Sequence, residues 1–125
     1  KRMGLENLAS EIVPCDIMVP TCGQGAIGIE TRPDDDIMQL LQTINDEQSQ
    51  REVSIERAIQ ARVGGGCHVP LGIHADIEGD RIEIYLSLGN ENGNIVVHEK
   101  LSGDLDAEQT LITNASNLLL KHSSK

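Results

Sequence analysis

The residue best suited to covalent chemistry in this sequence is Cys67, which lies in a loop between glycines and a proline. Residues 64–66 are all glycine, and Pro70 follows the cysteine three positions later. Glycines allow positive φ angles and carry no side chain that could shield a neighbour. The loop therefore favours a sulfur presented into a cleft, where a thiolate could act as a nucleophile. A small thiol buried in a loop is the alternative, and the residues alone leave it open.

A second candidate is the polar turn at residues 21–25, in which Gly23 and Gly25 flank Gln24. The backbone N–H groups of a glycine-rich turn can cradle an anion, although turns with two glycines are common. The pattern does not match a dinucleotide-binding motif, which needs three spaced glycines between a strand and a helix. The sequence therefore marks this turn only as a candidate anion site.

The remaining candidates have simple structural interpretations. Arg57 reads as a surface residue paired with Glu52 or Glu56 on one helix, and Arg2 reads in the same way. A zinc site could draw on three cysteines and one histidine, namely Cys15, Cys22, Cys67 and His68. The cysteine spacing and the adjacent Cys67-His68 pair are unlike the usual zinc sites, so we expect no metal.

The composition excludes several functional classes. The chain has 125 residues, and 10 basic against 20 acidic residues give a net charge of −10. That balance disfavours nucleic acids and anionic membranes as partners, because both need a basic surface. No apolar run approaches the roughly 20 residues of a membrane span. The odd count of three cysteines, with no secretion signal, predicts a reducing, cytoplasmic environment.

The elements that must position these residues fall into two parts, divided near Asn45 and Asp46. In the first part, apolar residues at 15–19 and 26–30 predict short strands on either side of the polar turn. Residues 33–44 predict an amphipathic helix, because acidic residues open it and apolar residues recur at helical spacing.

The second part predicts a helix, three strands and a final helix, at 47–62, 71–77, 81–88, 94–101 and 105–121. Val53, Ala58 and Ile59 are the expected inward positions of the first of these helices, which ends at the glycine run. The fold class is therefore α+β. We expect a C-terminal three-stranded antiparallel sheet with helices on one face, preceded by an incomplete α/β piece.

Three segments of the sequence together resemble one enzyme family. They are residues 20–30 (PTCGQGAIGIE), residues 56–58 (ERA) and residues 65–72 (GGCHVPLG). In this order and rough spacing they resemble porphobilinogen deaminase, also called hydroxymethylbilane synthase. Residues 1–5 (KRMGL) look like that family's motif just upstream. The Gly-Gly-Cys segment with its valine and proline is the most specific part of the resemblance.

The resemblance implies an enzyme of three domains, of which two are α/β lobes and the third is a small antiparallel sheet with helices. The chain would then hold the end of domain two (1–20), the segment that returns to domain one (21–45) and the whole C-terminal cofactor-bearing domain (46–125). The first two pieces would be incomplete. We therefore expect the chain to be cut from a longer protein, with its N-terminal part missing.

The resemblance also implies a transferase of haem and tetrapyrrole biosynthesis. It condenses four porphobilinogen molecules, with loss of ammonia, into linear hydroxymethylbilane. The product grows on a dipyrromethane cofactor that would be joined to Cys67 by a thioether. Arg57 and Arg2 fall at family positions that bind pyrrole carboxylates, and Gln24 with its flanking glycines matches a turn near the cofactor cleft. The family's catalytic aspartate lies outside this sequence, so the resemblance implies no catalytic residue here and an inactive isolated chain.

Two other functions stay open at this point. The chain could be a stand-alone α+β ligand-binding or regulatory module without covalent chemistry, or a small metal-binding protein. The resemblance implies a monomeric enzyme whose partners are porphobilinogen and the rest of the same protein. In the isolated chain, missing lobes would leave apolar residues 15–29 uncovered, which predicts aggregation, domain exchange or dimerisation.

Overall fold

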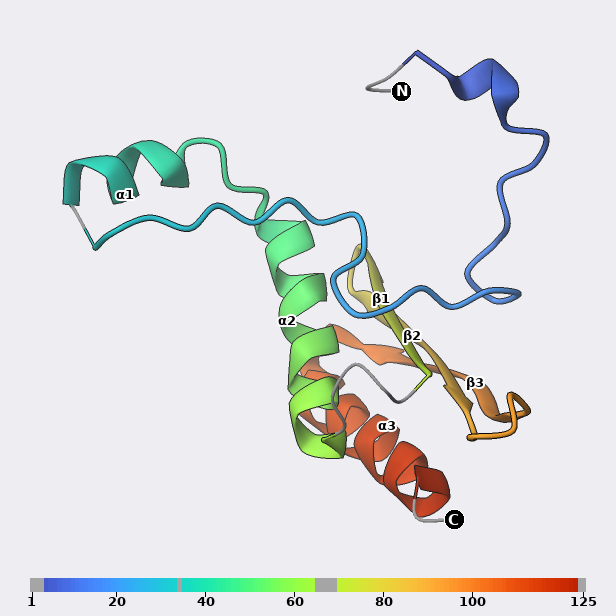
Figure 1. The fold of residues 1–125 in the computed structure, drawn as a ribbon. Coiled ribbons are helices and arrows are strands. Elements are labelled where there is room, and N and C mark those ends of the chain that lie inside the picture. The colour runs from blue at the N-terminus through green and yellow to red at the C-terminus, as the bar shows by residue number, and fades with distance from the viewer. Residues whose placement is uncertain (1–3, 34, 65–69, 124–125) are drawn as a thin grey trace.

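A three-stranded antiparallel sheet organises the C-terminal part of the chain (Figure 1). In a computed structural model, which describes residues 4–33, 35–64 and 70–123, the strands are β1 (Leu71–Glu78), β2 (Arg81–Gly89) and β3 (Ile95–Asp104). They lie in the order β1-β2-β3. The alternating sequence pattern predicted all three, and the prediction is confirmed to within three residues at each end.

The hairpin between β1 and β2 sets which side chains face the core. Gly79 turns the chain with a φ of 58°, a conformation that favours glycine. Ile77 then lies opposite Ile82, and Ile73 lies opposite Leu86. Because side chains alternate along a strand, this register brings the apolar residues of both strands to one face.

Two helices cover that face and complete the core. They are α2 (Glu47–Val63) and α3 (Glu108–Ser123), the latter entered through the 3₁₀ turn η2 (Leu105–Ala107). The predicted α+β class, with helices on one face of the sheet, is confirmed. The buried apolar residues all belong to the helices and the sheet: Ile55, Ile59, Ile73, Ala75, Ile77, Ile82, Ile84, Leu86, Leu88, Val97, Leu111, Ile112, Ala115 and Leu119.

Helix α2 begins and ends where its sequence signals lie, but its buried face differs from the prediction. The Asp46 side chain accepts a hydrogen bond from the Ser49 N–H at 2.8 Å, and Gly64 ends the helix with a φ of 67°. The prediction of Ile59 as a buried position is confirmed. Ala58 is only partly buried but packs against the core, so it also faces inward, whereas Val53 is partly buried without packing against the core. The other buried positions are Ile55 and a carboxylate, Glu56.

The N-terminal part holds little regular structure. It contains a 3₁₀ turn, η1 (Glu6–Leu8), and one helix, α1 (Asp35–Gln42), which confirms the predicted amphipathic helix. The strands predicted at 15–19 and 26–30 are wrong: both segments are irregular, and Ile27 is 84% exposed. A strand needs a neighbour to pair its backbone groups, and no described segment pairs with either. Figure 1 shows this part as an extended path leading to α1, which lies apart from the sheet.

Among the described residues, no helix has both the length and the apolar character needed to cross a membrane.

Candidate functional site

The free edge of β1 is covered by acidic side chains of α2. The N–H of Ile77 donates to Glu52 Oε1 at 3.0 Å, and the N–H of Ala75 donates to Glu56 Oε1 at 3.0 Å. Residues four apart on a helix rise about 6 Å, and alternate residues on a strand are about 6.8 Å apart. The two spacings nearly match, so side chains on successive turns of α2 can accept hydrogen bonds from successive free N–H groups of β1. Without these acceptors, the edge of the strand would be unpaired.

Glu56 also joins a third segment to this edge. Its second carboxylate oxygen, Oε2, accepts a hydrogen bond from the Gly23 N–H at 2.6 Å. Beside it, the Ile73 N–H donates to the Pro20 carbonyl at 2.9 Å. Three consecutive free N–H groups of β1, at residues 73, 75 and 77, are thus paired, and the segment around residues 20–23 is docked on the same edge.

The turn at residues 21–25 is held by its own hydrogen bonds, as the sequence predicted for a tight turn. The Gln24 N–H donates to the Thr21 carbonyl and the Ala26 N–H to the Gly23 carbonyl, each at 3.1 Å. The Gln24 side-chain oxygen accepts from the Thr21 hydroxyl at 3.2 Å. With the Gly23 N–H given to Glu56, these groups are engaged within the protein and do not form the open N–H cradle considered above.

Arg57 and the two glycines of the turn line one pocket of about 610 Å³. The pocket lies between the segment that follows the turn, the end of α1 and one side of α2. Its lining includes two charged residues, Asp46 and Arg57. Asp46 caps α2, whereas Arg57 is an exposed guanidinium 11 positions further along the helix, about 16 Å away. The Arg57 end of the pocket is therefore suited to a carboxylate.

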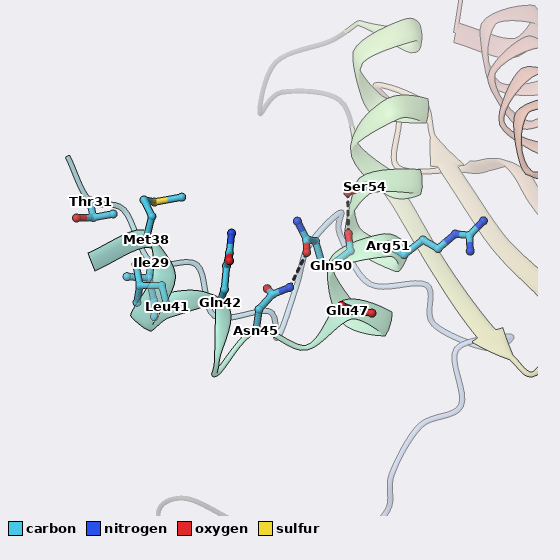
Figure 2. A pocket seen from close by; sticks show the side chains of 10 residues that line it. All are labelled: Ile29, Thr31, Met38, Leu41, Gln42, Asn45, Glu47, Gln50, Arg51 and Ser54. Carbon is cyan, nitrogen blue, oxygen red and sulfur yellow. Dashed lines mark hydrogen bonds between the residues drawn. The ribbon is translucent and has the colours of Figure 1, made fainter. Parts of the chain in front are cut away.

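A second pocket, of about 830 Å³, lies between α1 and the start of α2 (Figure 2). Several of its polar side chains pair with their neighbours: the Asn45 amide donates to Gln50 Oε1 at 2.6 Å, and the Ser54 hydroxyl donates to the Gln50 carbonyl at 2.7 Å. Figure 2 shows Arg51 extending away from α1, and its Nε donates to Glu108 at 2.8 Å. This pocket holds none of the candidate site residues.

The buried carboxylate of Glu56 is ionised and paired with His74. Burial alone would raise the pKa of Glu56, but hydrogen bonds from His74, Gly23 and Ala75 outweigh it and lower the pKa below its ordinary value. His74 Nδ1 lies 3.2 Å from Glu56 Oε1, and this hydrogen bond raises the pKa of the imidazole. The His74 ring stacks on Tyr85 with the ring centroids 6.1 Å apart. The pair therefore joins α2 to the outer face of the sheet.

Cys22 lies beside the same group and is poorly suited to act as a nucleophile. Partial burial raises the pKa of its thiol, the charge of Glu56 raises it further, and Arg57 opposes them. The reactive form of a cysteine is the thiolate, which this environment disfavours. Cys15 and Cys22 are both free thiols.

The structure brings together some of the predicted site residues. Gly23, Gly25 and Arg57 line one pocket, and Gln24 stabilises the turn between them. Arg2 and Cys67 lie outside the described residues. Within the described part of the chain, no three histidine, cysteine or acidic side chains are grouped to hold a metal ion.

Glu56 and His74 were not predicted from the sequence. From its place in the sequence, Glu56 was considered only as a surface partner of Arg57. One signal could have found the first of them. Glu52 and Glu56 are four residues apart and flank Ile55, so they share the helix face that a sheet edge would meet.

Comparison with known proteins identifies the family of this chain. Residues 50–120 match the family model described as porphobilinogen deaminase, C-terminal domain. Residues 1–40 match the model described as porphobilinogen deaminase, dipyromethane cofactor binding domain.

Curated relatives agree with both matches. The chain is 41% identical over 97 residues to the porphobilinogen deaminase of Roseiflexus castenholzii (strain DSM 13941 / HLO8), and 40% identical over 97 residues to that of Roseiflexus sp. (strain RS-1). Each alignment covers 77% of this chain and 32% of the relative, so the matched region is about a third of their length. The C-terminal domain match alone extends over more than half of the sequence, and the chain belongs to the porphobilinogen deaminase family.

Proposed function

We propose that this chain forms the cofactor-bearing part of a porphobilinogen deaminase. The complete enzyme is a transferase that joins four porphobilinogen molecules, with loss of ammonia, into the linear tetrapyrrole hydroxymethylbilane for haem biosynthesis. Two family domains matched in their expected order support this assignment. The structural observation that carries it is the pocket in which Arg57 meets the glycines of the turn at residues 21–25.

The residues present fit an acidic pyrrole ligand. A dipyrromethane carries acetate and propionate groups, and a guanidinium can bind such a carboxylate through two parallel hydrogen bonds. Arg57 is exposed and lines the pocket beside small glycine residues and the apolar side chains of Ile27 and Ile29. We infer that Arg57 binds a carboxylate, that the apolar wall faces a pyrrole ring, and that Arg2 supplies a second guanidinium.

We assign the thioether to Cys67. The loop that carries it leaves α2 at Gly64, seven positions after Arg57, or about 10 Å along the helix axis. It returns at Pro70, whose carbonyl accepts a hydrogen bond from the Gly89 N–H at 2.8 Å. The protonated state favoured for the Cys22 thiol argues against attachment there. The bound cofactor supplies the pyrrole terminus on which the product chain is assembled.

The division of the chain follows from the same proposal. Residues 1–20 would end domain two, residues 21–45 would return to domain one, and residues 46–125 would form the complete C-terminal domain. The break between the two family models, after residue 40 and before residue 50, supports a boundary near Asp46. The rest of the enzyme would contribute the catalytic aspartate, so the 125-residue chain alone should form no hydroxymethylbilane.

The apolar surface of the N-terminal part supports a further element of the proposal. Ile12, Ile27, Ile29 and Ile44 are each more than half exposed. Large exposed apolar patches promote association. We infer that the complete enzyme covers this surface and works as a monomer in the reducing cytoplasm, whereas the isolated chain self-associates. Light scattering tests this, and an isolated chain that is a monodisperse, tightly folded monomer would contradict it.

Cofactor loading tests the proposal directly. A full-length deaminase in which this sequence replaces the matched region of the Roseiflexus castenholzii enzyme should carry a dipyrrole adduct by intact mass. The bound dipyrrole should also give a coloured product with acidic p-dimethylaminobenzaldehyde. Cys67→Ser should abolish both signals and the formation of hydroxymethylbilane, whereas Cys22→Ser should retain the adduct. Full activity without the Cys67 thiol would contradict the proposal. A parent hybrid that is active but carries no adduct would show that this chain binds its ligand without a covalent bond.

A further inference from the structure

One buried acidic group has no role in the chemistry proposed above. Glu56 is only 4% exposed, and both of its carboxylate oxygens accept hydrogen bonds. Its partners come from different segments: the Gly23 N–H from the turn, and the Ala75 N–H and the His74 ring from β1. A buried charge is costly unless it is fully paired, so this carboxylate holds three elements in one arrangement.

Glu52 provides an internal comparison on the same helix. It lies one turn earlier and accepts from the Ile77 N–H at 3.0 Å, which gives it the same edge-pairing role as Glu56. The same oxygen of Glu52 also accepts a hydrogen bond from the Gln48 side-chain amide, on α2 itself, at 2.9 Å. Of the two glutamates, only Glu56 reaches the turn at residues 21–25.

Arg57 follows Glu56 in the sequence, and Gly23 is the residue of the turn whose N–H donates a hydrogen bond to Glu56. Both line the 610 Å³ pocket, together with Gly25. We propose that Glu56 is a positioning residue, which fixes the turn against β1 so that Gly23, Gly25 and Arg57 stay on the walls of one carboxylate-binding pocket. The inference rests on the proposed function, because that function supplies the carboxylate ligand.

The charges around Glu56 favour this role. His74 faces Glu56 from β1, and the charges of Asp76 and Glu52 add to that of Glu56 in raising the pKa of the imidazole. Tyr85 from β2 stacks on the His74 ring, and Lys100 from β3 lies 5.0 Å from the centre of the Tyr85 ring. On the turn, Cys22 lies close enough to Glu56 and Arg57 for both charges to act on the pKa of its thiol. Glu56 thus connects the imidazole on β1 with the turn at residues 21–25.

The test compares Glu56→Gln with Glu52→Gln in the full-length hybrid enzyme. A glutamine at 56 has one acceptor oxygen, so it cannot serve both the Gly23 N–H and the partners on β1. A glutamine at 52 retains the single oxygen that its partners use. We expect amide hydrogen exchange in residues 21–26 to become about tenfold faster in Glu56→Gln only, in line with loss of a hydrogen bond to a charged group.

Steady-state kinetics supply the second measurement. Glu56→Gln should raise the KM for porphobilinogen about tenfold and leave kcat within about threefold, because a misplaced Arg57 weakens ground-state and transition-state binding alike. Glu52→Gln should match the parent in both. Equal effects in the two variants, or faster exchange with an unchanged KM, would overturn the positioning role. If the parent hybrid forms no product, the proposed function fails instead. The exchange measurement then still decides whether Glu56 holds the turn, and unchanged exchange would refute it.

Discussion

Replacing Gly72 with alanine should detach the N-terminal segment from the edge of the sheet. A Cβ atom at this position would lie 2.6 Å from the Val19 carbonyl oxygen and 3.0 Å from the Val19 Cβ. Ordinary contact begins at 3.4 Å, so the two segments must separate by about 0.8 Å, the difference between 3.4 and 2.6 Å. Both atoms in the closer clash are fixed to backbone, and neither can rotate away.

The expected cost follows from the hydrogen bonds that this movement breaks. The bond from the Ile73 N–H to the Pro20 carbonyl is a neutral pair, worth about 0.5–1.5 kcal/mol, and the bond from the Gly23 N–H to Glu56 is charged, worth about 1.5–3 kcal/mol. Their loss together costs about 2–4.5 kcal/mol. The core between the sheet and the helices does not depend on these bonds. The segment should therefore leave while the domain stays folded.

Amide hydrogen exchange measures this response in the full-length hybrid. In Gly72→Ala, exchange at Ile73 and Gly23 should accelerate by about tenfold for every 1.4 kcal/mol lost, and core amides such as that of Ile84 should change little. Gly28→Ala is the matched control, because no atom lies within 4 Å of its added Cβ. Unchanged protection at Ile73 and Gly23 in the Gly72 variant would refute the docking described here.

Three further predictions concern the stability of the chain, measured by thermal unfolding with circular dichroism. Ile59→Ala removes a fully buried side chain and should lower the free energy of unfolding by about 2–5 kcal/mol. Ile44→Ala removes a side chain that is 68% exposed and should lower it by less than about 0.5 kcal/mol. Similar losses in the two variants would contradict the assigned core. Because Glu56 raises the pKa of His74 above 6.5, the stabilisation from the imidazolium is complete below that pH and is lost as pH rises through the raised pKa. The stability difference between the parent and His74→Gln should therefore narrow from pH 6 to pH 9, and a widening difference would contradict the pairing. Lys100→Ala should change stability far less than Ile59→Ala, because its ion pair with Glu83 is exposed, and a loss comparable to that of Ile59→Ala would show that the pair is stronger than its exposure implies.

The C-terminal domain could be predicted closely from the sequence because its signals are local. Alternation at Ile82, Ile84, Leu86 and Leu88 determines the inner face of β2, and each of these residues is buried. Asp46 and the glycine run mark the two ends of α2. Turn, cap and alternation all agree here, and such agreement is typical of segments that fold as their sequence indicates.

The errors arise where a residue's environment is set by a distant segment. Residues 15–19 and 26–30 are apolar, so their pattern favoured buried strands, yet neither segment joins the described sheet as a paired strand. Glu56 is charged, so its pattern favoured the surface, yet the open N–H groups of β1 and the Gly23 N–H require acceptors there. The spacing of Glu52 and Glu56 marks one helix face, but it does not identify the partner, a sheet edge that forms 19 residues later in the chain.

The attachment of the cofactor to Cys67 is the central claim, and a tryptic map of the full-length hybrid tests it most directly. Trypsin cleaves after Arg62 and Arg81, so residues 63–81 form one peptide whose single cysteine is Cys67. Cys15 and Cys22 fall together in a different peptide, because Arg32 is followed by proline and the next cleavage site is Arg51. We predict a dipyrrole adduct on the peptide of residues 63–81. An adduct on the peptide that holds Cys15 and Cys22, with residues 63–81 unmodified, would contradict the claim.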